Sequence, residues 1–159
     1  LDVHQGDGTA TILKDDAGIF MLSVHCQANF PFRKAESTMD VGLPEQLGDA
    51  EYLQAVREAL NTVAEFKPQL VLFQAGVDGL QTDALGRLAI SRAGMKRRND
   101  LVFDACIAWQ TPCVVFMGGG YSKPIEHTVD AFTDLFVQAS QTHLRLTTPR
   151  PTSKNSAGA

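Results

Sequence analysis

The 159-residue chain is poor in the features that mark several classes of protein. Its three cysteines, Cys26, Cys106 and Cys113, form no CxxC pair and are too few for a disulfide scaffold, so we expect reduced, mostly buried thiols in a cytoplasmic protein. No apolar run approaches the roughly 20 residues that span a bilayer, and no signal-peptide pattern is present. A net charge of −4 gives no overall attraction for nucleic acid or an anionic membrane, and we expect neither as a partner.

What the chain does have is a regular alternation of short apolar runs and segments with helical periodicity. Apolar runs bounded by turn residues predict buried strands, and apolar residues at i, i+3 and i+4 predict helices. We expect strands at 19–24, 38–43, 70–73 and 113–117, and helices at 49–66, from 91 to about 109, and from 122 onward. This order predicts an α/β protein whose parallel sheet carries helices on both faces. Residues 1–146 would form one domain, and 147–159 a flexible tail rich in Pro, Thr and Ser.

In such sheets, functional sites form at the carboxyl ends of the strands, and three strand-end loops carry unusual residues. The first loop, residues 1–9, contains Asp2 and His4. Residues two apart in an extended segment point to the same side, so the two side chains can converge on one point. A carboxylate and an imidazole there suit Zn²⁺ or another divalent metal, and the alternative is an ordinary turn built on Gly6 and Gly8.

The other two loops follow strongly apolar strands. Asp78 comes shortly after the strand at 70–73, where a carboxylate is costly unless it is paired or binds a metal, and the alternative is a turn cap. Gly118, Gly119 and Gly120 follow the strand at 113–117 and precede Tyr121. Three glycines let the backbone pass close to a ligand, whereas a phosphate-binding loop would need Lys and Ser/Thr in a different order. For Tyr121 the alternative is a packed aromatic ring.

The three loops together resemble a known family. Asp2-Val3-His4-Gln5-Gly6-Asp7-Gly8-Thr9, Ala75-Gly76-Val77-Asp78 and Gly118-Gly119-Gly120-Tyr121 are similar to the signature loops of the zinc-dependent histone deacetylase superfamily. The resemblance covers nearly all of residues 1–140, and the stretch 83–94 is most similar to class IV deacetylases and their bacterial relatives. It implies a three-layer arginase–deacetylase-like fold. It also implies a hydrolase that removes an acetyl or acyl group from an acyl-lysine protein or peptide, or from an acetylated small amine.

The resemblance also implies roles for individual residues. Asp2, His4 and Asp78 would bind Zn²⁺, with Fe²⁺ as the alternative metal, and Tyr121 would hydrogen-bond the substrate carbonyl. Asp7 falls where the family has an Asp or Asn near its second active-site histidine, and it would be a catalytic residue together with Tyr121. A structural K⁺ or Na⁺ would be held by four residues: Asp2, His4, Ser23 and Val24. The substrate would be contacted by a further four: Phe30, Leu85, Gly119 and Gly120.

Three departures from related patterns shape these expectations. Gln5 stands where the common form has a second histidine, which should be tolerated because that position is not a metal ligand. Gly6 stands where arginase-like enzymes carry a bridging carboxylate, which favours a single metal. The family's adjacent His-His general base is missing, because the four histidines, at positions 4, 25, 127 and 143, are never adjacent.

The chain begins at Leu1 without an initiator Met, and its first motif lies at the terminus. We therefore expect the C-terminal part of a larger deacetylase, with the general base upstream and the fragment alone inactive. The alternative is a non-catalytic domain that binds a metal or a partner and keeps a vestigial deacetylase site. No pattern in the sequence sets an oligomeric state.

Overall fold

The computed structural model describes residues 1–147. Their helices and strands are, in chain order, α1 (Asp7–Leu13), β1 (Leu22–Cys26), β2 (Met39–Leu43), α2 (Asp49–Phe66), β3 (Val71–Ala75), α3 (Arg92–Trp109), β4 (Cys113–Met117) and α4 (Glu126–Thr147). The α/β class with parallel strands is confirmed. The expected tail at 147–159 lies outside the described residues except for Thr147, which is the last residue of α4.

Several elements differ from the sequence expectation; α4, for example, begins at Glu126 instead of residue 122. The first strand begins at Leu22 instead of residue 19, because hydrogen bonds to the β2 segment start only at Met21. The Met21 N–H donates to Thr38 Oγ1, and the Met21 carbonyl accepts the Met39 N–H. Helix α1 lies in the segment of Gly6 and Gly8, for which an ordinary turn was the alternative interpretation. There the Ala10 N–H donates to the Gly6 carbonyl at 3.1 Å, and the acidic Asp7 in the first turn suits a helix N-terminus.

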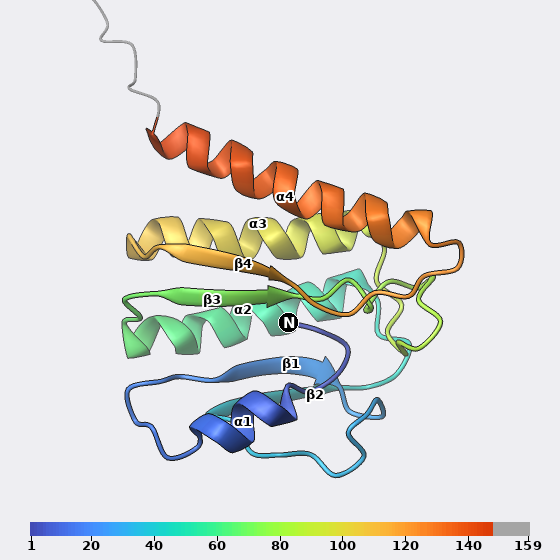
Figure 1. The fold of residues 1–159 in the computed structure, drawn as a ribbon, viewed down its shortest axis with the longest axis horizontal. Helices are drawn as coiled ribbons and strands as arrows, with labels where there is room; N and C mark the ends of the chain where they lie inside the picture. Colours follow the sequence, from blue (N-terminus) through green and yellow to red (C-terminus); the bar gives the residue numbers. More distant parts are fainter. Residues whose placement is uncertain (148–159) are drawn as a thin grey trace, which may run out of the picture.

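The strands form two parallel pairs that the first residues of the chain join. β1 pairs with β2, and β3 pairs with β4, all pointing the same way (Figure 1). Residues 1–3 lie between the pairs: the Gly76 N–H donates to the Leu1 carbonyl, and the Cys26 N–H donates to the Val3 carbonyl, each at 3.0 Å. The segment that carries Asp2 is therefore held between the carboxyl ends of β1 and β3.

Helices α2 and α3 cover one side of the strands and end in the same way. Lys67 and Gln110 follow them in the left-handed region, with φ of 55° and 56°, and a proline follows within two residues. At the start of α3 the Ser91 hydroxyl accepts the Gly94 N–H at 3.0 Å and donates to Asp49 of α2 at 2.6 Å. These caps fix both helices behind the strand ends.

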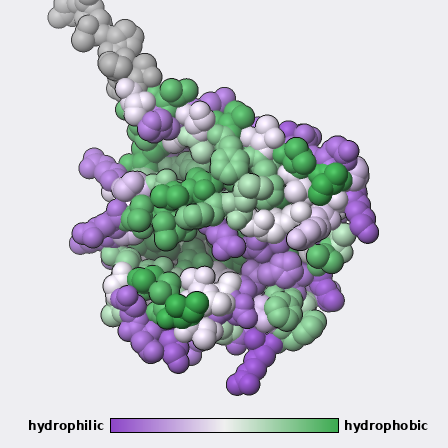
Figure 2. Space-filling model, viewed as in Figure 1, coloured by the Kyte–Doolittle hydropathy of each residue, from purple (hydrophilic) through white to green (hydrophobic). Residues whose placement is uncertain are grey.

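The opposite side of β3 and β4 is open within residues 1–147. Leu72, Val114 and Phe116 point to that side and are 65%, 44% and 47% exposed. Figure 2, viewed as in Figure 1, shows apolar side chains gathered over this region. None of the helices among the described residues has the length and hydropathy needed to cross a membrane.

Candidate metal centre

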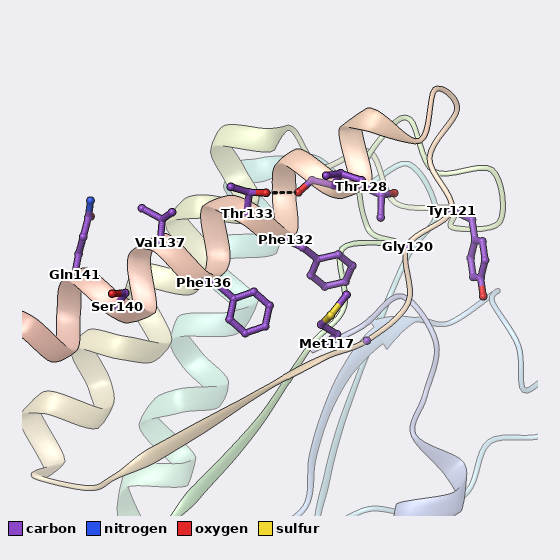
Figure 3. A pocket seen from close by; sticks show the side chains of 12 residues that line it. Met117, Gly120, Tyr121, Thr128, Phe132, Thr133, Phe136, Val137, Ser140 and Gln141 are labelled. Carbon is purple, nitrogen blue, oxygen red and sulfur yellow. Dashed lines mark hydrogen bonds between the residues drawn. The ribbon is translucent and has the colours of Figure 1, made fainter.

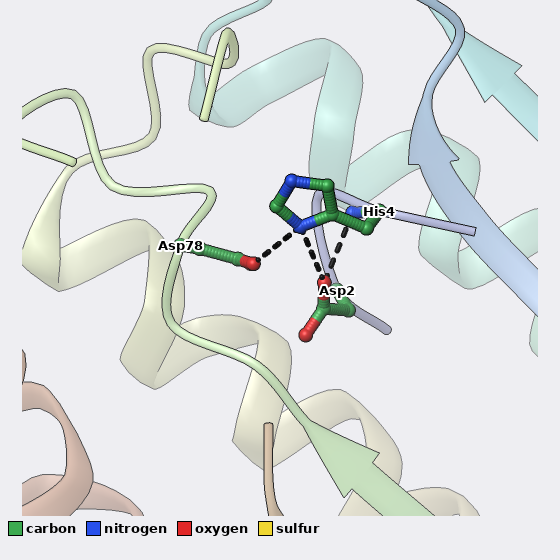
Figure 4. A group of neighbouring side chains, drawn as sticks. All are labelled: Asp2, His4 and Asp78. Atoms are coloured by element: carbon green, nitrogen blue, oxygen red, sulfur yellow. Dashed lines mark hydrogen bonds and ion pairs between the residues drawn. The ribbon is translucent and has the colours of Figure 1, made fainter. Parts of the chain in front are cut away.

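Three side chains from distant parts of the sequence meet at the carboxyl ends of the strands. His4 Nδ1 lies 2.9 Å from Asp78 Oδ2 and 3.3 Å from Asp2 Oδ1 (Figure 4). One ligand atom of each residue lies within 4.8 Å of the other two. The loop after β3 thus brings Asp78 to the segment that carries Asp2 and His4.

Backbone N–H groups hold the two carboxylates in place. The Val3 N–H donates to Asp78 Oδ1 at 2.8 Å, and the Gly119 N–H donates to Asp2 Oδ2 at 2.9 Å. The His4 N–H donates to Asp2 Oδ1, also at 2.9 Å. Such secondary contacts orient side chains that bind a metal and keep them in position.

Burial shifts the acid–base properties of the cluster. It raises the pKa of Asp78 to about 6, since the carboxylate is almost completely buried and lies beside Asp2. Burial would also raise the pKa of Asp2, but hydrogen bonds from Asp78, Gly119 and His4 outweigh it and lower that pKa. The hydrogen bond to Asp78 raises the pKa of His4.

These residues fit a divalent metal. Asp78 is 1% exposed, and within residues 1–147 no Lys or Arg forms an ion pair with it or with Asp2. Within the part of the chain that the structure describes, two acids and one imidazole therefore share a partly desolvated site without a Lys or Arg partner. One nitrogen and two oxygen donors match the ligands of Zn²⁺ or Fe²⁺, and three protein ligands leave a coordination position open.

The glycine-rich loop approaches the carboxylates as closely as its sequence suggests. A Cβ atom at Gly119 would collide with Asp78 Oδ2, so only glycine brings its N–H to Asp2 here. Gly120 is similarly confined, by Val77 and Thr128. The assignment of both glycines to substrate binding stays a prediction.

Tyr121 follows these glycines and is 62% exposed. In Figure 3 its ring lies apart from Phe132 and Phe136 of α4, although all three line one groove. The groove has a volume of about 830 Å³, runs between the end of β4 and α4, and is mainly apolar. Tyr121 is therefore not a packed core aromatic.

The residues assigned to the substrate tunnel lie on two connected, exposed loops. Phe30 and Leu85 are 61% and 57% exposed. Asn29 connects their loops, because its Nδ2 donates to the Leu85 carbonyl at 2.9 Å and its Oδ1 accepts the Arg87 N–H at 3.1 Å. Phe30 also contacts Phe32 edge-on, with ring centroids 6.1 Å apart.

The roles assigned to Asp7 and to the monovalent-cation residues rest on the family resemblance alone. Asp7 is exposed in the first turn of α1 and does not belong to the ligand cluster. Ser23 Oγ lies 2.9 Å from Nδ1 of the buried His25, and burial lowers the pKa of that histidine. A K⁺ or Na⁺ held by Asp2, His4, Ser23 and Val24 stays a prediction.

Two supporting residues were not identified as such from the sequence. Gln5 is 4% exposed, and its amide bonds with the Ala35 backbone and with Asp40. Arg98 follows Lys96 and Arg97 in a run of basic residues, a pattern typical of a solvated face, but it is 1% exposed. It donates to the Gly76 carbonyl at 2.5 Å, and its guanidinium lies 5.5 Å from the Phe73 ring centroid. The sequence signal for its burial is that Arg98 lies three residues before Leu101, and residues at i and i+3 share one face of a helix.

Comparison with known proteins places this geometry in a family. A model of the histone deacetylase domain matches residues 1–136. The chain is 47% identical over 130 residues to an uncharacterized protein of Picosynechococcus sp., covering 81% of this chain and 43% of that protein. It is 36% identical over 127 residues to histone deacetylase 2 of Arabidopsis thaliana, covering 77% of this chain and 33% of that protein. The chain thus spans less than half the length of these relatives.

The structural comparison agrees with the sequence comparison. A crystal structure of an HDAC homolog complexed with SAHA matches with a TM-score of 0.75 and 28% identity, covering 89% of this chain and 40% of that one. The expected arginase–deacetylase fold is therefore confirmed. The chain belongs to the histone deacetylase family.

Proposed function

We propose that this chain carries the metal site and the substrate-activating tyrosine of a deacetylase that hydrolyses an N-acyl amide. The observation that carries this proposal is the cluster of Asp2, His4 and Asp78, with one ligand atom of each within 4.8 Å of the others. Zn²⁺ is the metal we propose, with Fe²⁺ as the alternative. We propose acyl-lysine as the substrate class, or an acetylated small amine, because the SAHA-bound HDAC homolog has the same fold.

Each residue of the site would have a distinct task. Asp2, His4 and Asp78 would hold the metal, and the N–H groups of Gly119 and Val3 would keep the carboxylates aligned. A divalent metal bound there would polarise a substrate carbonyl and lower the pKa of a bound water. The Tyr121 hydroxyl would donate to the same carbonyl oxygen, and its hydrogen bond would strengthen as negative charge develops there.

The proton acceptor is proposed to come from sequence outside this chain. Deprotonating water and later protonating the leaving amine calls for a residue with a pKa near neutrality, and histidine is the usual one. Apart from the proposed ligand His4, the chain offers His25, which is buried and bonded to Ser23, and two exposed histidines on α4. None of the three belongs to the ligand cluster.

The test compares the 159-residue chain with the protein translated from the whole gene. We expect both to bind about one zinc, and only the whole protein to release acetate from an acetyl-lysine peptide or from acetylated putrescine. If the whole protein binds zinc and hydrolyses neither substrate, the non-catalytic metal-binding alternative replaces this proposal. If neither polypeptide binds zinc or iron, the metal site itself is refuted.

A further inference from the structure

One carboxylate outside the metal cluster joins the two loops on which the proposed chemistry depends. Asp83 Oδ2 accepts the Tyr121 N–H at 2.6 Å. Its other oxygen, Oδ1, accepts the N–H groups of Leu85 at 2.9 Å and Gly86 at 2.7 Å. Asp83 is half-buried, and among the described residues it forms no ion pair with a Lys or Arg. Its hydrogen-bond donors are these three backbone N–H groups.

The same loop rests directly on a proposed metal ligand. A Cβ atom at Gly86 would collide with the backbone carbonyl of Asp78, so the chain at Gly86 touches the residue that supplies a ligand. The contact is possible only with glycine at this position. Through Gly86, the position of Asp83 is tied to that of Asp78.

Further bonds make this junction between the loops rigid. The Ala84 N–H donates to the Tyr121 carbonyl at 3.1 Å, and the Lys123 N–H donates to the Thr82 carbonyl at 3.0 Å. Asp83 and Ser122 form an isolated antiparallel bridge. Tyr121 is 62% exposed, so its ring has little packing to hold it, and these backbone bonds carry most of the restraint.

We propose that Asp83 is a positioning residue that fixes Tyr121 relative to the metal ligand Asp78 through a carboxylate shared by the two loops. It does not touch the substrate; it acts through Tyr121. This inference rests on the proposed function, in which the Tyr121 hydroxyl donates to the substrate carbonyl and therefore has to be held in position. Displacing a catalytic group by about 1 Å can cost about 100-fold in rate.

Asp83→Asn should remove the contact with Tyr121 and keep the contacts with Leu85 and Gly86. The amide retains one oxygen, which can still accept the two N–H groups of Leu85 and Gly86. Its NH₂ group then faces the Tyr121 N–H, and two donors cannot bond. We expect kcat of the whole-gene protein to fall about 10- to 100-fold, with KM and zinc content nearly unchanged. Asp104→Asn, on the exposed side of α3, is the matched control and should leave all three values unchanged.

A double-mutant cycle with Tyr121→Phe distinguishes positioning from a general structural effect. If Asp83 acts through the tyrosine hydroxyl, Asp83→Asn should change kcat less than about twofold in the Tyr121→Phe background, because coupled residues are not additive. An equal loss of kcat in both backgrounds would refute the proposal. If Tyr121→Phe alone leaves kcat unchanged, the role of the tyrosine in the proposed function fails instead.

Hydrogen exchange gives a readout that needs no activity. The Tyr121 amide of the unaltered 159-residue chain should be protected although the residue is exposed, and Asp83→Asn should speed its exchange at least tenfold. Rapid exchange of the Tyr121 amide in the unaltered chain would overturn the proposal even if the variant fails to fold. Unchanged exchange in a folded variant would overturn it equally.

Discussion

His4 Nδ1 lies 2.9 Å from Asp78 Oδ2, although the two residues are 74 positions apart in the sequence. The contact exists because residues 1–3 lie between β1 and β3, at the strand end from which the Asp78 loop emerges. Both side chains therefore depend on the same local geometry.

Replacing Asp78 with Asn should abolish metal binding. The neutral amide is a poor ligand for Zn²⁺, and a metal held by three protein side chains loses one of them. We expect zinc per chain, measured by inductively coupled plasma mass spectrometry after dialysis, to fall from about one to near zero. Asp104→Asn, an exposed carboxylate on α3, should keep its zinc. A zinc-loaded Asp78→Asn protein would show that the ligand set is assigned incorrectly.

Tyr121→Phe should lower kcat without changing metal content. Phenylalanine keeps the ring but removes the hydroxyl, and loss of one donor to a developing oxyanion costs about 10²–10³ in kcat. Because that bond strengthens in the transition state, KM should change little. Steady-state kinetics of the whole-gene protein, with zinc analysis in parallel, provide the measurement. Loss of zinc together with activity would contradict the assignment.

Gln5→His should destabilise the fold, although histidine is the common residue in the related motif. The Gln5 amide accepts the Ala35 N–H at 2.8 Å and donates to Asp40 at 2.7 Å and to the Ala35 carbonyl at 2.9 Å. An imidazole cannot satisfy all these groups, and a buried unsatisfied group costs about 1–3 kcal/mol. Urea unfolding should show a loss of that size. Gln54→His, at an exposed site on α2, should show almost none.

This glutamine also illustrates what the sequence could and could not predict. The convergence of Asp2 and His4 was predicted, because the i, i+2 spacing of an extended segment carries that information. The sequence did not predict that Gln5 is a buried anchor, since its partners come from 30 or more residues away and no local pattern encodes them. The expected tolerance of Gln5 therefore considered only metal ligation.

The same distinction applies to the fold. Helix α2 has the predicted bounds, because Asp49, the apolar periodicity and Pro68 are local signals. The burial of Arg98 could not be predicted, since its partners are the Gly76 carbonyl and the Phe73 ring, which tertiary structure brings to it. Adjacent charged residues make Arg98 look solvated in the sequence. Local periodicity predicts elements, whereas buried polar contacts follow from the packing of those elements.

The ion pair between α3 and α4 should make stability depend on acid pH. Arg92 Nε and Nη2 donate to the two oxygens of Asp134 at 2.6 and 3.1 Å, and this interaction lowers the pKa of Asp134. A lowered pKa in the folded state adds stability that is fully present above the unfolded value near 4 and is lost as pH falls below it.

The measurement compares the unaltered chain with Asp134→Asn. The free energy of unfolding in urea should be lower for the variant at pH 7, and the difference should shrink between about pH 4 and pH 2. High salt should also reduce it, because the pair lies at the surface. A difference that stays constant over this pH range would show that the ion pair is not its source.

The apolar groove beside α4 should make the 159-residue chain bind hydrophobic dyes while it is folded. Phe136 and Val137 are 44% and 47% exposed on α4, and they line the groove together with Met117 at the end of β4, which is 60% exposed. Apolar surface of this extent attracts anilinonaphthalene sulfonate, as it attracts protein partners. We expect clear dye fluorescence from a chain whose near-UV circular dichroism still shows fixed tertiary packing.

Phe136→Gln should reduce that fluorescence at least twofold, because the ring forms part of the groove wall. Leu144→Gln, also exposed on α4 but outside the groove, should leave it nearly unchanged. Equal fluorescence from both variants would locate the dye elsewhere, and loss of the near-UV signal would attribute it to loosened packing instead of the groove.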